Sequence, residues 1–472
     1  MSGAPSRQPE AELGLLDATM IGMGAMIGAG VFVLTGLAAE ITGPAVVLVF
    51  LFNGVVTGFT GLAYAELSSA IPKSGGGYAF VEEVFSDGVA FQMGWMLWFG
   101  YMIAGALYAL GFAANFVEWV HIYWEGLPAG GVLGGVTEWT VIYAIGIVSL
   151  LVLLNVVSTA ASGAAETAGT MIKVGILIVF SAFGALAIET GEYTPVFPHG
   201  SAAIIPAMGL TFIAFQGYDL ISTVTEEVED PRRNIPRAIF IALVGTVLVY
   251  LTVVLVSVGT LGAERLGEEG ETAIASAAGE FMPEIPLLGP GSTLIWFGAV
   301  FSTFTALNAV VIASSRVAFA MGRDRLFPSR LGRIHHSFGT PSLAVVASAG
   351  VMLGSVILLP IQRVGNLSSF FFLLAFVAVN AAVIRLRRRR PDMNRPYEMP
   401  FYPVPPLLGI VFNVGIGGFL LYRDPITGVL ALAWMALGVL VYLSLKKAGY
   451  VGERGNGSEE ATGATGDDPS SD

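Results

Sequence analysis

The chain has 472 residues, of which 54% are hydrophobic and 12% are charged. A soluble fold could not bury so large an apolar fraction, and the 60 glycines and 30 phenylalanines are typical of helices that pack closely in lipid, so the composition predicts a polytopic membrane protein. Cysteine is absent, which excludes disulfides and thiolate metal sites, and the net charge of −12 argues against nucleic acid as a partner.

Twelve apolar runs are each long enough to cross a bilayer, which takes about 20 residues of helix. Open strands cannot span lipid because their unpaired backbone groups would lose their water, so we expect an all-α membrane protein with twelve transmembrane helices. The runs lie near residues 15–41, 44–70, 89–117, 139–157, 166–188, 202–226, 238–262, 292–320, 341–360, 366–384, 404–422 and 425–446.

The basic residues between the runs predict the orientation, because cytoplasmic loops carry an excess of Lys and Arg. With the N-terminus in the cytoplasm, only Arg265, Arg363 and Arg423 of the 23 Lys and Arg residues fall outside, and Lys173 lies within a run. We therefore predict a multi-pass protein of the cell membrane with both termini in the cytoplasm.

Four glycines interrupt the first run between Gly22 and Gly30, where an intact helix would lose roughly 1 kcal/mol per glycine relative to alanine. One interpretation is an unwound segment at 28–30, whose amides and following half-helix would face an anionic group such as a carboxylate. The other is that Gly24 and Gly28 form a packing face of small residues.

The sixth run is interrupted by Gln216, Gly217 and Asp219. Two interrupted helices five runs apart are typical of inverted-repeat transporters, which hold the substrate at the interruptions. We therefore expect discontinuous helices 1 and 6 and an inverted repeat of helices 1–5 and 6–10. The corresponding segments are an N-terminal tail at 1–12, the two repeats at 13–190 and 191–386, helices 11 and 12 at 387–447, and an acidic disordered tail at 448–472.

Lys173 is the only lysine within a run, and an ionisable residue inside a membrane is costly. It could be a proton carrier, because burial disfavours its charged form, or it could extend its long stem to the cytoplasmic interface. Asp219 is a second candidate for proton coupling, with the alternative that it caps the second half of the sixth helix.

Four motifs in the same order resemble those of the amino acid-polyamine-organocation permeases, which share the five-plus-five fold of the sodium-coupled leucine transporter. The motifs lie at 27–32, 72–78, 215–238 and 315–324. The resemblance implies that amides around Gly28 to Gly30 hold a substrate carboxylate, while carbonyls around 212–215 accept its ammonium group. It also implies that Lys173 takes the place of sodium, with Thr305 or Ser302 as its hydroxyl partner. Ile213 departs from the pattern, because many relatives carry an aromatic gate there.

These arguments give two sets of predicted site residues. The substrate-binding set is Ile27, Gly28, Ala29, Gly30, Phe212, Ile213, Phe215 and Gly217, and the proton-coupling set is Lys173, Asp219 and Thr305. The four histidines are not paired at ligand spacing within a run, so we expect no metal and no cofactor.

We expect a secondary active transporter that takes up neutral or broad-range amino acids with protons by alternating access. Its partners would be the amino acid, protons and membrane lipid. An exchanger of amino acids or polyamines, or a cationic amino acid permease, is the alternative, although runs 3, 8 and 10 offer no carboxylate for a cationic side chain. An enzyme is disfavoured because no run pairs two aspartates or a serine with a histidine. Ring motifs of channels and phosphate-binding loops of ATP-driven pumps are also missing from the sequence.

Overall fold

The structure is a computed structural model that describes residues 13–73, 75–121, 132–133, 136–157, 163–285, 289–336 and 338–450. The predicted N-terminal tail and residues 451–472 of the predicted acidic tail lie outside the described residues. Within the described part the chain is almost wholly helical, and one short antiparallel pair joins β1 (Val132–Leu133) to β2 (Val136–Thr137).

The helices follow the apolar runs closely, and short 3-10 turns join several of them. The α-helices are α1 Leu15–Met26, α2 Ala29–Thr42, α3 Val46–Ala70, α4 Gly76–Val84, α5 Asp87–His121, α6 Glu138–Val157, α7 Gly163–Gly184, α8 Ile204–Thr211, α9 Tyr218–Ile221, α10 Pro231–Leu261, α11 Ala263–Glu269, α12 Ala273–Phe281, α13 Ser292–Arg323, α14 Ser342–Leu358, α15 Ile361–Arg389, α16 Val404–Arg423 and α17 Pro425–Lys447. The 3-10 turns are η1 Gly43–Ala45, η2 Thr190–Tyr193, η3 Ser201–Ala203, η4 Phe212–Phe215, η5 Ser222–Glu227 and η6 Gly270–Thr272.

Ten segments of the described chain are long and apolar enough to cross a membrane, so the prediction of a multi-pass helical membrane protein is confirmed. The first of these segments, Leu15–Ala70, is 56 residues long and contains α1, α2 and α3, and α14 is a shorter apolar helix of 17 residues. Twelve crossings require the first segment to cross twice and α14 to cross once. The count of twelve and the inverted repeat stay predictions.

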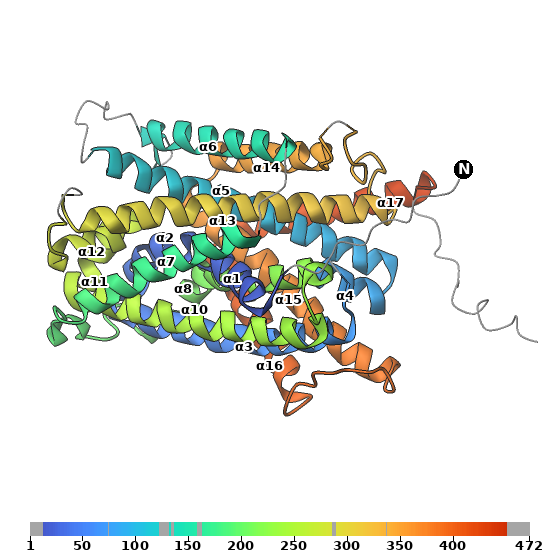
Figure 1. Ribbon diagram of the computed structural model, residues 1–472, viewed down its shortest axis with the longest axis horizontal. Helices are drawn as coiled ribbons and strands as arrows, with labels where there is room; N and C mark the ends of the chain where they lie inside the picture. The colour runs from blue at the N-terminus through green and yellow to red at the C-terminus, as the bar shows by residue number, and fades with distance from the viewer. Residues whose placement is uncertain are drawn as a thin grey trace, which may run out of the picture.

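The short helices α1, α2 and α8 lie in the middle of the molecule, surrounded by long helices that run along its length (Figure 1). The half-helix α1 packs on α10, α7 and α9, while α2 packs on α8, α11 and α12. Helix α2 is almost wholly buried, whereas the outer helices α6 and α17 expose large apolar side chains such as Leu153, Leu154 and Leu440. This arrangement puts the interruptions in the protein interior and apolar surfaces outside, where lipid would cover them.

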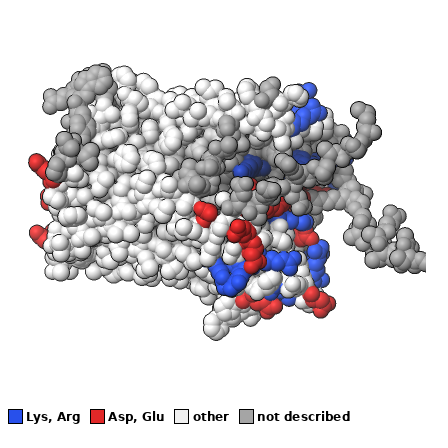
Figure 2. Space-filling view, in the orientation of Figure 1, with Lys and Arg blue, Asp and Glu red and all other residues white. Residues whose placement is uncertain are grey.

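Charged side chains gather at the two ends of the molecule and leave an uncharged belt between them (Figure 2). We call the end formed by α4, the start of α10 and the last turns of α15 and α17 the basic end; it carries Arg232, Arg233, Arg237, Arg385, Arg387 to Arg390, Lys446 and Lys447. We call the end formed by α11, η6 and the last turn of α2 the acidic end; it carries Glu40, Glu264, Glu268, Glu269 and Glu271.

At the basic end, one fully buried carboxylate ties α3 to α15. The carboxylate of Glu66 is 0% exposed and accepts from Arg387 Nε at 2.6 Å and Nη2 at 2.7 Å. The N–H of Met399 donates to the same carboxylate at 2.9 Å. The carboxylate thus accepts two bonds from one guanidinium and one from the backbone. With this geometry, the attraction within a buried ion pair can offset the free-energy cost of removing both charges from water.

A second, more exposed cluster at this end holds α4 against the last turn of α15. Glu83 pairs with Lys73 at 3.0 Å and with Arg390 at 2.7 Å. Burial alone would raise the pKa of Glu83, but the hydrogen bonds and charges of Lys73 and Arg390 outweigh burial and hold that pKa below its usual value. Since the Lys73 side chain is 63% exposed, its pair contributes little to stability.

We predict that Glu66→Gln lowers the free energy of unfolding by about 3 kcal/mol, because it leaves a largely buried guanidinium without its counter-charge. Thermal unfolding of the purified protein in detergent measures this. The control is Lys73→Gln, which removes an exposed pair and should cost less than about 1 kcal/mol. Equal destabilisation by the two variants would contradict the assignment of Glu66 as the principal electrostatic tie.

Candidate functional site

The first interruption lies between α1 and α2, at Ile27 and Gly28. The backbone of Gly28 has φ −116° and ψ −126°, outside the helical region, and a Cβ at this position would overlap the side chain of Ala306. No described residue accepts a hydrogen bond from the N–H of Ala29 or Gly30. These amides begin the 14-residue helix α2, so the interruption presents free donors and the positive end of a helix dipole in the protein interior.

The second interruption lies between α8 and α9. The chain passes through the turn η4, then Gln216 is extended and Gly217 has a φ of +140°, which favours glycine. A Cβ at Gly217 would lie 2.6 Å from the backbone nitrogen of Met26, the last residue of α1. The two interruptions are therefore in direct backbone contact.

One tyrosine bridges the two interruptions. The hydroxyl of Tyr250, on α10, lies 2.5 Å from the carbonyl oxygen of Met26 and 3.0 Å from that of Ala214. Its side chain is 0% exposed, so no water competes for these carbonyls. The sequence analysis missed Tyr250, although the signal was present: it is the only tyrosine in the apolar run 238–262.

Two serines satisfy further backbone groups at the interruptions. The hydroxyl of Ser302, on α13, donates to the carbonyl of Ile27. The hydroxyl of Ser369, on α15, accepts from the N–H of Ile213 at 3.1 Å and donates to the carbonyl of Leu210 at 3.2 Å. All of these groups are buried, so each bond removes the cost of an unpaired polar group.

Lys173 extends from α7 toward the first interruption and is 0% exposed. Its Nζ donates to the carbonyl of Gly24 at 2.7 Å and to Thr305 Oγ1 at 2.9 Å. The hydroxyl of Thr305 donates in turn to the carbonyl of Ser302 at 3.0 Å. In this conformation the ammonium group joins α1 to α13 and does not extend to an interface.

Asp219 lies at the start of α9, where its carboxylate accepts three hydrogen bonds. The donors are Tyr101 Oη at 2.5 Å, Gln216 Nε2 at 3.0 Å and the N–H of Gly217 at 2.9 Å. The N-cap of α9 is Gly217 and Asp219 is the second residue of the helix, so Asp219 is not the cap that the alternative interpretation expects; its carboxylate accepts from the N–H of the N-cap residue instead. A role of Asp219 in proton coupling stays a prediction.

The apolar members of the predicted substrate-binding set pack around the second interruption. Phe212 packs edge-to-face against Phe376 with ring centroids 5.9 Å apart, and Phe215 packs edge-to-face against Tyr250 with centroids 5.4 Å apart. Ile213 is 1% exposed, at the position where the family pattern has an aromatic gate. The structure brings the whole predicted set together at the two interruptions, while the role of each residue in binding stays a prediction.

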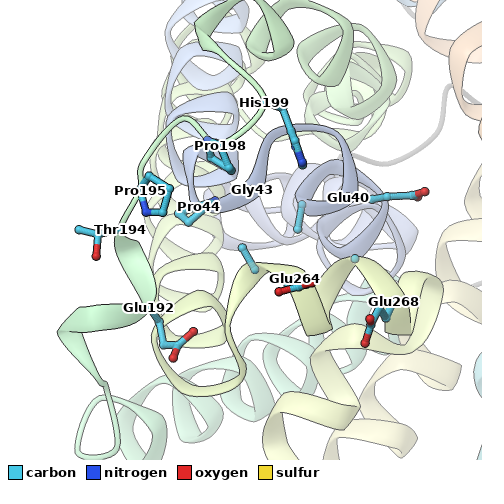
Figure 3. A pocket seen from close by; sticks show the side chains of 13 residues that line it. Glu40, Gly43, Pro44, Glu192, Thr194, Pro195, Pro198, His199, Glu264 and Glu268 are labelled. Atoms are coloured by element: carbon cyan, nitrogen blue, oxygen red, sulfur yellow. The ribbon is translucent and has the colours of Figure 1, made fainter.

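A separate cavity of about 570 Å³ lies at the acidic end, away from both interruptions. Figure 3 shows Glu192 from η2 and Glu264 and Glu268 from α11 around it, with His199 on the opposite side. The glutamates that line the cavity make the acidic end of the molecule negatively charged. No group of three His, Asp or Glu among the described residues is arranged to hold a metal ion.

Comparison with known proteins gives a family and several similar transporters. A family model described as amino acid permease matches residues 13–442, which include both interruptions and Lys173. The branched-chain amino acid permease of Bacillus subtilis is 29% identical over 440 residues, covering 91% of this chain and 92% of the relative. The methylthioribose transporter of Bacillus subtilis is 29% identical with the same coverage. The branched-chain amino acid permease of Lactococcus lactis is 30% identical, covering 91% of this chain and 93% of the relative.

We predict that Gly217→Ala abolishes transport or folding, because its Cβ would meet the backbone of α1, which cannot move aside as a side chain can. Substrate uptake in vesicles and elution from a size-exclusion column report the two effects. Gly58→Ala is the matched control: no atom lies within 4 Å of the Cβ it would add to α3, so uptake and elution should stay unchanged. Full uptake by Gly217→Ala would disprove the close backbone contact.

Proposed function

Because the chain belongs to the amino acid permease family, within the amino acid-polyamine-organocation superfamily, we propose that it is a secondary active transporter that carries neutral amino acids into the cell with protons. The family is one of permeases, not of enzymes. The free amides of Ala29 and Gly30 at the start of α2 carry this proposal. Free donors at a helix N-terminus bind carboxylates, and a buried helix start without partners is otherwise costly.

The second interruption supplies the complementary polarity. The turn η4 lies close to the α2 amides, because Gly30 packs directly against Ala214: a Cβ at Gly30 would lie 2.6 Å from the Cβ of Ala214. A zwitterion with its carboxylate on the amides and its ammonium on the carbonyls of η4 would satisfy both groups. This arrangement recognises the common part of every α-amino acid and leaves specificity to the side chain.

The environment of the interruptions favours a substrate with a neutral side chain. Asp219 is the carboxylate closest in sequence to the second interruption, and it already accepts three hydrogen bonds. A cationic side chain would need a carboxylate free to pair with it, because an unpaired buried charge is costly. Large apolar rings line η4 instead, and two of the similar permeases are named for branched-chain amino acids. We propose branched-chain or other apolar amino acids as the preferred class.

Lys173 supports coupling to protons. Its ammonium binds the carbonyl of Gly24, three residues before Ile27, and the hydroxyl of Thr305. A fixed cation at this point can take the structural role of a bound metal ion, and it can also lose its proton when the cavity opens. The transport cycle would then need no sodium.

Purified protein in liposomes should accumulate labelled leucine when the outside is acidic, and a sodium gradient alone should drive no accumulation. In Lys173→Ala we expect accumulation to fall to the level that the wild type reaches when the proton gradient is collapsed. Counterflow should persist, because the amides that bind the substrate remain. Lys446→Ala, an exposed lysine at the basic end, is the control and should match the wild type. Proton-driven accumulation by Lys173→Ala equal to that of the wild type would refute the role of this lysine.

Competition should reveal the class of substrate. Excess isoleucine or valine should block leucine uptake, while arginine should compete at least about tenfold less well, because a buried polar mismatch costs more than a missing methylene. Methylthioribose has neither a carboxylate nor an ammonium group, so it should not compete. Block by methylthioribose but not by valine would reject binding of an α-carboxylate by the α2 amides.

A further inference from the structure

A small cavity leads from the basic end of the molecule toward Lys173. It has a volume of about 140 Å³, enough for several waters, and Glu166, Ala25, Asn308 and Arg316 are among its lining residues. Arg316 is exposed, so the cavity reaches the surface at this end. With the basic end in the cytoplasm, as the distribution of Lys and Arg predicts, the cavity opens to the cytoplasm.

The inner wall of this cavity touches the groups that hold Lys173. Ala25 directly follows Gly24, whose carbonyl accepts from the lysine. Asn308 lies three residues, or one turn, after Thr305 on α13. The cavity therefore borders residues next to both groups that hold the ammonium.

Glu166 is the acidic residue of α7 on the same face as Lys173. Residues 166, 170 and 173 are spaced by four and three, so they share one side of the helix, and Lys173 lies about 10 Å along the axis from Glu166. Long side chains on a helix lean toward its N-terminus, which directs the lysine toward Glu166. Both Glu166 and Thr170 border Gly24: a Cβ at Gly24 would lie 2.8 Å from Glu166 Oε1 and would overlap the hydroxyl of Thr170.

The carboxylate of Glu166 is half-buried, and it forms no hydrogen bond or ion pair with any described residue. Its neighbour Asp17, on α1, differs: it accepts from the N–H of Gly14 at 3.1 Å and from Thr167 Oγ1 at 2.8 Å. The other charged groups that face this region are Lys173 on α7, Arg316 on α13 and Glu227 on η5. A partly desolvated carboxylate without a hydrogen-bond partner among the described residues is free to exchange a proton with cavity water, and it also interacts with the charge of Lys173.

We propose that Glu166 is the proton-relay residue between Lys173 and the cytoplasm. This inference rests on the proposed proton-coupled function. When Lys173 releases its proton, the lysine becomes a neutral amine, and the proton passes through water and the Thr170 hydroxyl to the Glu166 carboxylate. The resulting carboxylic acid then loses the proton to water in the cavity, which restores the carboxylate. One proton moves inward and no other reactant is consumed.

A purely structural role makes a different prediction. Glu166 lies in the first turn of α7, where a negative charge stabilises the helix dipole. Such a role would change the stability of the protein, and it would affect proton-driven uptake and substrate exchange equally. A relay affects only the steps in which a proton is released.

The test compares the wild type with E166Q, E166D and E229Q in liposomes. Glu229 is an exposed carboxylate at the same end that does not line the cavity, so E229Q should match the wild type. E166Q should slow proton-driven leucine uptake by about tenfold, since a positioned acid–base group contributes at least that much, and its rate should no longer depend on internal pH. Leucine counterflow at equal pH should stay within twofold of the wild type, roughly the precision of such assays, and E166D should recover most of the proton-driven rate.

Three results would overturn the relay. In the first, E166Q keeps the uptake rate and the pH profile of the wild type. In the second, E166Q reduces counterflow and proton-driven uptake by the same factor with an unchanged pH profile, which indicates a structural role. In both, proton-driven uptake by the wild type leaves the proposed function intact. In the third, the wild type shows no proton-driven uptake, and then the proposed function and the relay are both rejected.

Discussion

Backbone N–H and C=O groups that leave a helix inside a bilayer must find other partners, since no water is present to replace them. Here two interrupted helices meet that requirement jointly. The hydroxyl of Tyr250 lies within hydrogen-bond distance of a carbonyl from each interrupted helix. The hydroxyl of Ser302 donates to a carbonyl at the first interruption, and that of Ser369 donates to a carbonyl beside the second. Among the described residues, the amides of Ala29 and Gly30 at the start of α2 have no acceptor. Because the surrounding groups are already bonded, the free donors are fixed in position. A carboxylate that binds them would therefore cost little free energy of protein reorganisation.

The same requirement brings the charged group of α7 to the first interruption. Gly24 in the last turn of α1 and Ile27 just after it have carbonyls that accept from Lys173 and Ser302. Thr305 links the two donors, because it accepts from Lys173 and donates to the carbonyl of Ser302. In the proposed cycle, a change in the charge of the lysine would alter the packing of α1 against α13 beside the first interruption. Binding of a cation and binding of a substrate can affect each other through a structural element that both contact, and the end of α1 would be such an element in this cycle.

Much of this fold follows from the sequence, and the parts that do not are tertiary. Apolar runs and their length predict the helices, and the glycines at 28 and 217 mark where two of them break, although Ala29 and Gly30, predicted in the unwound segment, already belong to α2. The sequence could not separate Thr305 from Ser302, because residues three apart share a helix face and only the approach of α7 and α1 distinguishes them. Tyr250 lies on a helix that is otherwise apolar, so its partners on α1 and η4 could not be read from its neighbours.

The shortness of α14 has a consequence for the lipid around the protein. Its 17 residues span about 25 Å, less than the hydrocarbon core of about 30 Å, and its flanks expose Leu343, Val346 and Leu358. As the ninth of the twelve predicted crossings, α14 would require the acyl chains beside it to compress, at a cost of a fraction of a kcal/mol for each ångström. A thinner bilayer would then lower the free energy of the protein at this edge.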